Sequence, residues 1–84
     1  MSPKFKEQNG YVFKIYSNEE ARIHIHVIKA EKEAKYWLEP GIELAENYGF
    51  SSKELSFVEQ IITEYGDDFK VKFTRHVGKR LDDK

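Results

Sequence analysis

The chain has no cysteine, only two prolines and five glycines, and no long apolar run. The absence of cysteine excludes a disulfide framework, a thiol nucleophile and a cysteine zinc site. No stretch is apolar enough for a membrane span or a secretion signal, so we expect a cytoplasmic protein. Fourteen basic and fifteen acidic residues leave a net charge of −1, which excludes a global field that attracts nucleic acid or an anionic membrane.

The chain length of 84 residues predicts a single domain over residues 1–84. Its first half alternates apolar and polar residues with the period of a β-strand, and its second half has a helical period. We therefore predict an α+β fold in which a small antiparallel sheet of four or five strands, over about 4–46, precedes two C-terminal helices packed on one face. The predicted strands are 4–8, 11–16, 22–29, 34–38 and 42–46, with turns at Asn9-Gly10 and Pro40-Gly41 and a polar connection at 17–20.

Helix boundaries are marked by two signals in the second half. Ser51 and Glu54 have the spacing of a capping box, which predicts that a helix begins there. Gly66 is a candidate C-terminal stop, because glycine accepts the left-handed backbone of a helix end. These signals predict helices over 52–65 and 67–77, followed by a tail over 78–84.

The alternation assigns two faces to the sheet. A loop over 30–33 would place Val27 opposite Tyr36 in the core, and His26 opposite Trp37 on the other side. The core face would carry Tyr11, Phe13, Ile15, Ile23, Ile25, Val27, Ala34, Tyr36 and Leu38. The opposite side, which we call the outer face, would carry the aromatic and basic residues Lys14, Tyr16, His24, His26 and Trp37.

His24 and His26 are alternate strand residues, so their side chains point the same way, about 6.6 Å apart. Two imidazoles in this position can share a metal, but zinc needs further ligands. Glu19, Glu20, Glu39 and His76 are candidates that spacing alone does not fix. The simpler interpretation is two histidines packed beside Trp37. We expect no bound metal, no cofactor and no catalytic residue.

Nucleic-acid binding has two local candidates. Tyr16 and Trp37 could stack bases on the outer face. A basic run at Lys70, Lys72, Arg75, Lys79 and Arg80 could contact phosphates, although such runs are more often solvated helix faces. Nucleic acid therefore stays a possible partner.

Four motifs, in order, resemble a bacterial family: Tyr16 to Glu19, His24 to Val27, Ala34 to Pro40, and Asn47 to Leu55. It is the domain of unknown function numbered four thousand one hundred and sixty, and the similarity covers about 10–78. The resemblance implies a small antiparallel sheet with two helices. It also implies a protein partner, since members are often encoded in gene pairs resembling toxin-antitoxin modules. This chain has Glu20 to Ile23 where members commonly have a histidine and two prolines, so a potential third imidazole is missing.

These observations favour a binding module over an enzyme. The outer face combines tryptophan, tyrosine and basic residues, which are the types that dominate binding hot spots. We expect it to dock a small protein partner, as in a toxin-antitoxin-like pair. The alternative is a protein that binds nucleic acid or cleaves it with His24 or His26. The sequence does not define the oligomeric state.

Overall fold

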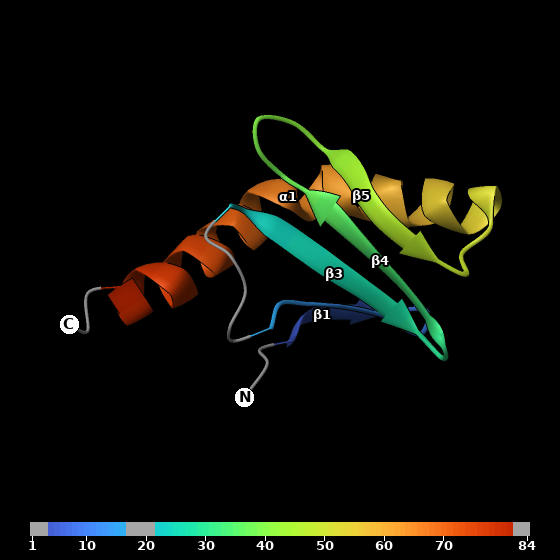
Figure 1. Cartoon of the computed structure of the whole chain (residues 1–84), viewed down its shortest axis with the longest axis horizontal. Helices are drawn as coiled ribbons and strands as arrows, with labels where there is room; N and C mark the ends of the chain where they lie inside the picture. Colours follow the sequence, from blue (N-terminus) through green and yellow to red (C-terminus); the bar gives the residue numbers. More distant parts are fainter. Residues whose placement is uncertain (1–3, 17–21, 82–84) are drawn as a thin grey trace.

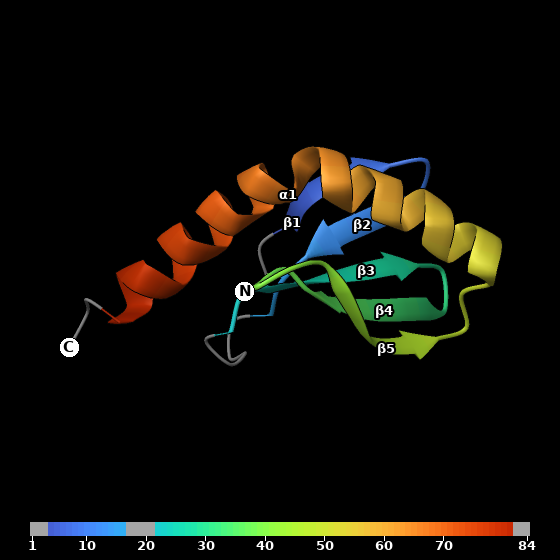
Figure 2. The same ribbon diagram turned by 90° about the horizontal axis from the view of Figure 1, so that it is seen from above.

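The computed structural model describes residues 4–16 and 22–81, with side chains described as far as His76. Five antiparallel strands lie in chain order across one sheet, and a long helix follows them (Figure 1). The C-terminal part of the helix continues past the end of the sheet (Figure 2). The predicted α+β class and antiparallel sheet are confirmed. The elements are β1 (Lys4–Gln8), β2 (Tyr11–Lys14), β3 (His24–Lys29), β4 (Lys32–Trp37), β5 (Glu43–Tyr48) and α1 (Ser52–Leu81).

The prediction of two helices is wrong, because α1 runs unbroken for 30 residues through Gly66. A glycine inside a helix costs about 1 kcal/mol relative to alanine. Phe69 and Phe73, which follow it on the same side of the helix, are both buried in the core. Burying one such side chain contributes about 1.5–3 kcal/mol, so their packing outweighs the cost of the glycine. The segment predicted as helix 67–77 and residues 78–81 of the predicted tail are therefore the continuation of α1, and residues 82–84 lie outside the described residues.

The hairpin between β1 and β2 forms as predicted. Asn9 and Gly10 adopt positive φ angles of 52° and 84°, as the tight turn between two short strands requires. The polar connection predicted at 17–20 lies outside the described residues.

The register predicted between β3 and β4 is wrong by two residues. Val27 pairs with Ala34 and His24 pairs with Trp37, because the turn contains only Ala30 and Glu31, with Ala30 at a φ of 55°. A shift of two residues keeps every side chain on its face. The predicted division between core face and outer face therefore holds despite the wrong partners.

The connection from β4 to β5 also differs in detail. Gly41 does not adopt a positive φ, so the predicted type II turn is wrong, and the Glu39–Pro40 peptide bond is cis. The predicted strand 42–46 is present as β5 (Glu43–Tyr48), with an irregularity in its pairing opposite Lys35 and Tyr36.

Aromatic contacts join the sheet to α1. The ring of Tyr11 lies 5.2 Å from that of Phe57, and the ring of Phe13 lies 5.5 Å from that of Phe69, measured between centroids. The core formed between these layers consists of Tyr11, Phe13, Ile15, Ile25, Val27, Ala34, Tyr36, Leu38, Phe50, Val58, Ile61, Ile62, Phe69 and Phe73.

One polar contact links the core to the helix surface. The hydroxyl of Tyr36, a buried residue of β4, donates a 2.8 Å hydrogen bond to the carboxylate of Glu59 on α1. Burial, together with this hydrogen bond, raises the pKa of Tyr36 well above its ordinary value. The phenol is therefore held in its neutral form.

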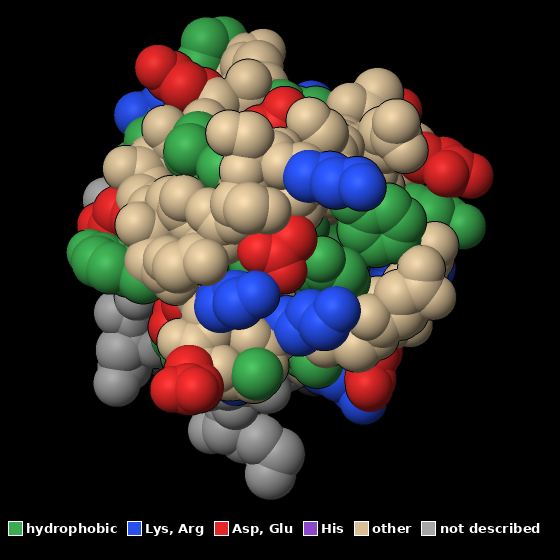
Figure 3. Space-filling model, turned by 90° about the vertical axis from the view of Figure 1, so that its right-hand side faces the viewer, with side chains coloured by type: hydrophobic (Ala, Val, Ile, Leu, Met, Phe, Trp, Pro, Cys, Tyr) green, Lys and Arg blue, Asp and Glu red, His purple; other side chains and the backbone are tan. Residues whose placement is uncertain are grey.

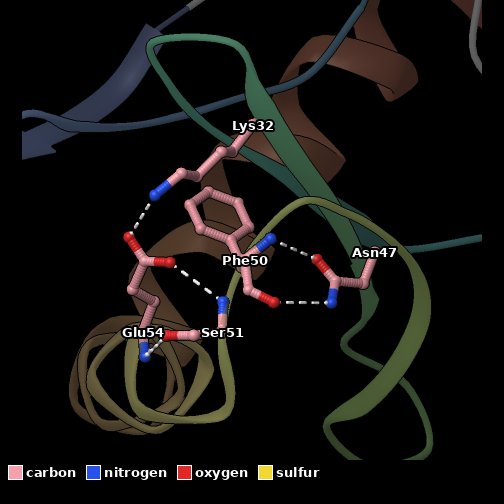
Figure 4. Close-up of polar contacts among 5 residues, drawn as sticks. All are labelled: Lys32, Asn47, Phe50, Ser51 and Glu54. Carbon is pink, nitrogen blue, oxygen red and sulfur yellow. Dashed lines mark hydrogen bonds and ion pairs between the residues drawn. The ribbon is translucent and has the colours of Figure 1, made fainter.

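The start of α1 has the predicted capping box. The backbone N–H of Ser51 donates to Glu54 Oε1 at 2.9 Å, and the backbone N–H of Glu54 donates to Ser51 Oγ at 3.2 Å (Figure 4). The side chain of Asn47 bonds to both backbone polar groups of Phe50, which fixes the loop that leads into the helix. The prediction that a helix begins at Ser51 and Ser52 is confirmed.

An ion pair ties this helix start to the sheet. Lys32 Nζ donates to Glu54 Oε2 at 2.8 Å. The hydrogen bond raises the pKa of Lys32 and lowers the pKa of Glu54, since each charge favours the other. Basic and acidic side chains lie side by side on this end of the molecule (Figure 3).

Candidate partner-binding site

The structure brings the five predicted residues of the outer face into one continuous row. Ring centroids are separated by 4.5 Å between Tyr16 and His26, 5.2 Å between His26 and His24, and 5.9 Å between His24 and Trp37. At one end of the row, Lys14 Nζ lies 4.8 Å from the centroid of the Tyr16 ring. The alternation of strand residues, with the pairing of His24 and Trp37 across β3 and β4, produces this arrangement.

The members of the row differ in exposure. His24 has 0% of its surface exposed and His26 has 6%, whereas Lys14, Tyr16 and Trp37 are half-buried. The ring of His24 also contacts Phe73 of α1, with centroids 5.1 Å apart. The histidines therefore form the floor of the outer face, and the lysine and the two larger rings form the part that solvent reaches.

Close contacts with oxygen atoms of Arg22 and Glu33 hold the two histidines. His24 Nδ1 lies 2.6 Å from the carbonyl oxygen of Arg22. Because a carbonyl oxygen can only accept, Nδ1 of His24 carries the hydrogen. Glu33 accepts a 2.9 Å hydrogen bond from the hydroxyl of Tyr16, and the same carboxylate oxygen lies 3.3 Å from His26 Nδ1.

Glu33 is a residue of this site that the sequence analysis missed. It lies on β4 and pairs with Ile28, which puts it on the outer face with Trp37. The loop predicted over 30–33 included Glu33, and the strand alternation assigns no face of the sheet to a loop residue. A two-residue turn at Ala30 and Glu31 is the signal that would have identified it.

Two cations lie against Trp37. Arg22 Cζ is 4.1 Å from the centroid of the ring, and Lys35 Nζ is 4.4 Å from it. Arg22 also donates two hydrogen bonds, of 3.3 and 3.1 Å, to the carbonyl oxygen of Glu39. A cation over an aromatic face contributes about 0.5–1 kcal/mol at exposed sites, so these contacts hold the indole in one position.

The metal interpretation gains no support from the described part of the chain. There, no group of three or more His, Asp or Glu side chains is arranged to hold a metal ion. Glu39 forms a 3.0 Å ion pair with Lys70 instead. Glu19 and Glu20 lie outside the described residues.

The basic run on α1 is partly occupied by internal contacts. Lys70 pairs with Glu39, and Lys72 pairs with Asp68 at 3.0 Å and donates to the carbonyl oxygen of Phe5 at 3.2 Å. The side chains of Lys79 and Arg80 lie outside the described residues. Cations engaged in this way are typical of a solvated helix face, which weakens the nucleic-acid interpretation of the run.

The match to a family model covers residues 10–74, which include the outer face, its floor and most of α1. The model is described as a domain of unknown function, DUF4160. This chain belongs to the DUF4160 family. No curated protein and no solved structure matches the chain. Within the described residues of this DUF4160 member, no helix has an apolar stretch that could cross a membrane.

Proposed function

We propose that this DUF4160 protein is a small module that binds a protein partner through its outer face, as one component of a toxin-antitoxin-like pair. The observation that carries the proposal is the row of contacts from Lys14 through Tyr16 and the two histidines to Trp37. Tryptophan and tyrosine are enriched among the residues that dominate binding energy. The gene pairing implied by the family resemblance also supports a protein partner.

Packing makes this surface suitable for docking. Helix α1 takes up the core face of the sheet, and the half-buried apolar pair Val12 and Ile28 extends the outer face beside the histidines. The hydrogen bond of His24 with Arg22 and the contact of His26 with Glu33 fix the floor, and the cations beside Trp37 fix its ring. A surface already held in its bound shape loses less conformational entropy on association.

The alternative is a protein that binds or cleaves nucleic acid with His24 or His26. A general acid or base must come within hydrogen-bond reach of the reacting group. His24 has no exposed surface and His26 has 6%, so the described geometry favours the protein partner. The cytoplasmic location stays a prediction.

The first experiment is purification of the untagged protein from its source cells at native level, followed by mass spectrometry and the ratio of absorbance at 260 and 280 nm. A small protein in stoichiometric amount supports the proposal. Co-purifying nucleic acid without a protein companion would contradict it and make His24 and His26 the first residues to change.

The second experiment tests the outer face itself. We expect Trp37→Ala to weaken the companion's binding by about 2 kcal/mol, which is about 30-fold in Kd. Lys14→Glu, at the other end of the row, should weaken it less. Val71→Ala changes an exposed apolar residue of α1 and serves as the matched control. An unchanged affinity of a Trp37→Ala protein that keeps its circular dichroism spectrum would refute the face assignment.

A further inference from the structure

The two edges of the sheet differ in how they are protected. At the β1 edge, the ring centroids of Phe5 and Phe69 are 6.2 Å apart, so Phe5 is covered by α1. The backbone carbonyl oxygen of Phe5 accepts a hydrogen bond from Lys72 Nζ. At the other edge, β5 pairs with β4 alone among the described strands, and all of its residues except Ala45 are exposed. The outer backbone edge of β5 is therefore open to another strand.

Exposed apolar side chains gather on this same edge. The described residues include four large hydrophobic side chains that are exposed, and three of them are Ile42, Leu44 and Tyr48, at 42%, 40% and 62%. Leu44 pairs with Tyr36 on the side of the sheet that faces the helix. The hydroxyl of Tyr36 donates a hydrogen bond to Glu59 of α1, whereas the side chain of Leu44 on the next strand is exposed to solvent. The helix thus covers β4 and leaves β5 uncovered.

The charge of this edge has one sign. Residues 39–50 contain three glutamates and no lysine or arginine. Glu43 and Glu46 pair with Trp37 and Lys35, which places both carboxylates on the outer-face side of β5. Strand β5 therefore presents acidic side chains on one side and the aliphatic Leu44 on the other.

We propose that an extended segment of the partner protein adds to the sheet along β5, with basic side chains beside Glu43 and Glu46 and an aliphatic side chain beside Leu44. This inference deepens the proposed function and rests on it. Addition of a strand to an open sheet edge gives affinity through main-chain hydrogen bonds and specificity through alternate side chains.

Two further observations support this occupant. Glu43 pairs with Trp37 and lies 4.0 Å from Arg22, so the β5 edge continues directly into the outer face. A second copy of this chain fits less well, because pairing β5 with another β5 would bring two acidic strands side by side. Like charges on neighbouring strands are destabilising.

The test is amide hydrogen exchange of the full chain, followed by NMR, with capped six-residue peptides as probes. One peptide alternates lysine and valine. A second alternates glutamate and valine, and a third alternates lysine and proline, which keeps the charge but cannot form a ladder. We expect saturating lysine-valine peptide to slow exchange of the outward-facing β5 amides at least tenfold, with no change in β1 and none from the other two peptides.

Charge variants sharpen the test. Glu43→Lys with Glu46→Lys should reverse the preference, so that the glutamate-valine peptide protects β5 instead. Glu64→Lys with Asp67→Lys makes the same charge change at exposed sites on α1 and should keep the original preference. Equal protection by the lysine-proline peptide, or no protection of β5 by any peptide, would overturn the strand-addition proposal.

The same readout separates this inference from the proposed function. If the native companion binds and Trp37→Ala weakens it, but β5 exchange is unchanged in the complex, strand addition fails while the outer face stands. Concentration-dependent protection of β5 without peptide, together with a dimer in sedimentation, would identify a second copy as the occupant of β5 and overturn the proposal that a partner segment binds there.

Discussion

The hydroxyl of Tyr36 donates a hydrogen bond to the carboxylate of Glu59, 2.8 Å away, and so joins the C-terminal end of β4 to the first half of α1. Tyr36 is 1% exposed, whereas Glu59 is exposed to solvent. Loss of Tyr36 would therefore leave a carboxylate that water can solvate, whereas loss of Glu59 would leave a buried hydroxyl without an acceptor.

Removing either partner of this bond should lower the free energy of unfolding by different amounts. Tyr36→Phe removes the buried donor and leaves a carboxylate that water can solvate, so we expect a loss of about 1 kcal/mol. Glu59→Ala leaves the buried hydroxyl without its acceptor, so we expect about 1–3 kcal/mol. Urea denaturation measures both, with Glu64→Ala as the exposed control. A Glu59→Ala cost no larger than that of Glu64→Ala would contradict the role of this bond.

Alkaline pH should destabilise the protein through Tyr36. Its pKa is raised in the folded state by burial first and by Glu59 second, above an ordinary value of 10.0. The stability that this raised pKa contributes is fully present below pH 10.0, the ordinary pKa, and is lost as the pH rises toward the folded-state pKa. Denaturation midpoints between pH 9 and pH 12 measure the effect, and in Tyr36→Phe this part of the pH dependence should disappear.

Acidic pH should weaken the contact between Lys32 and Glu54. The hydrogen bond from Lys32 lowers the folded-state pKa of Glu54 below its ordinary value of 4.5, so its contribution is present above that value and is lost as the pH falls. Glu54→Gln keeps an oxygen that can accept from the backbone of Ser51 but removes the charge. The variant should be less stable than the original at pH 7, and the difference should shrink toward pH 3. A pH-independent difference would contradict this assignment.

Gly66→Ala should stabilise the protein by about 0.5–1 kcal/mol, because alanine is the better helix residue and restricts the unfolded chain. A methyl group built at this position has no neighbour within 4 Å. Thermal and urea denaturation check the gain. A loss of stability would show that the helix needs glycine there.

Gly49→Ala should instead lower the free energy of unfolding, by about 1 kcal/mol or more. Gly49 has a φ of +102°, and a methyl group built on it would lie 3.1 Å from Lys32 Cγ. The same measurement as for Gly66→Ala applies, and a neutral result would mean that the loop before α1 relaxes without cost.

Local signals in the sequence predicted local structure well. The turn at Asn9 and Gly10 and the capping box of Ser51 and Glu54 depend only on neighbours in the chain, and both form as predicted. The alternation of polar and apolar residues also assigned the two faces correctly, because the period of a strand fixes which side a residue takes.

The turn predicted at Pro40-Gly41 from a local signal is wrong. The other predictions that failed depend on how distant parts of the chain pack or pair. Gly66 does not end the helix, because burial of Phe69 and Phe73 against the sheet outweighs a local preference. The contact of Glu33 with Tyr16 and His26 depends on the length of one turn, which the sequence did not fix. The burial of His24 depends in part on Phe73, 49 positions along the chain, and no spacing rule relates the two.

The unbroken helix has a consequence for how the molecule rotates in solution. Thirty residues at about 1.5 Å of rise per residue follow a path of about 45 Å, which arches along the longest dimension of a molecule that measures 42 × 25 × 20 Å (Figure 2). Rotation about the long axis is therefore faster than rotation of that axis itself. The N–H bonds of α1 point along the helix, close to the long axis, so their ¹⁵N relaxation reports mainly the slower motion. Elevated transverse relaxation rates in α1 would thus be a property of shape and no sign of association.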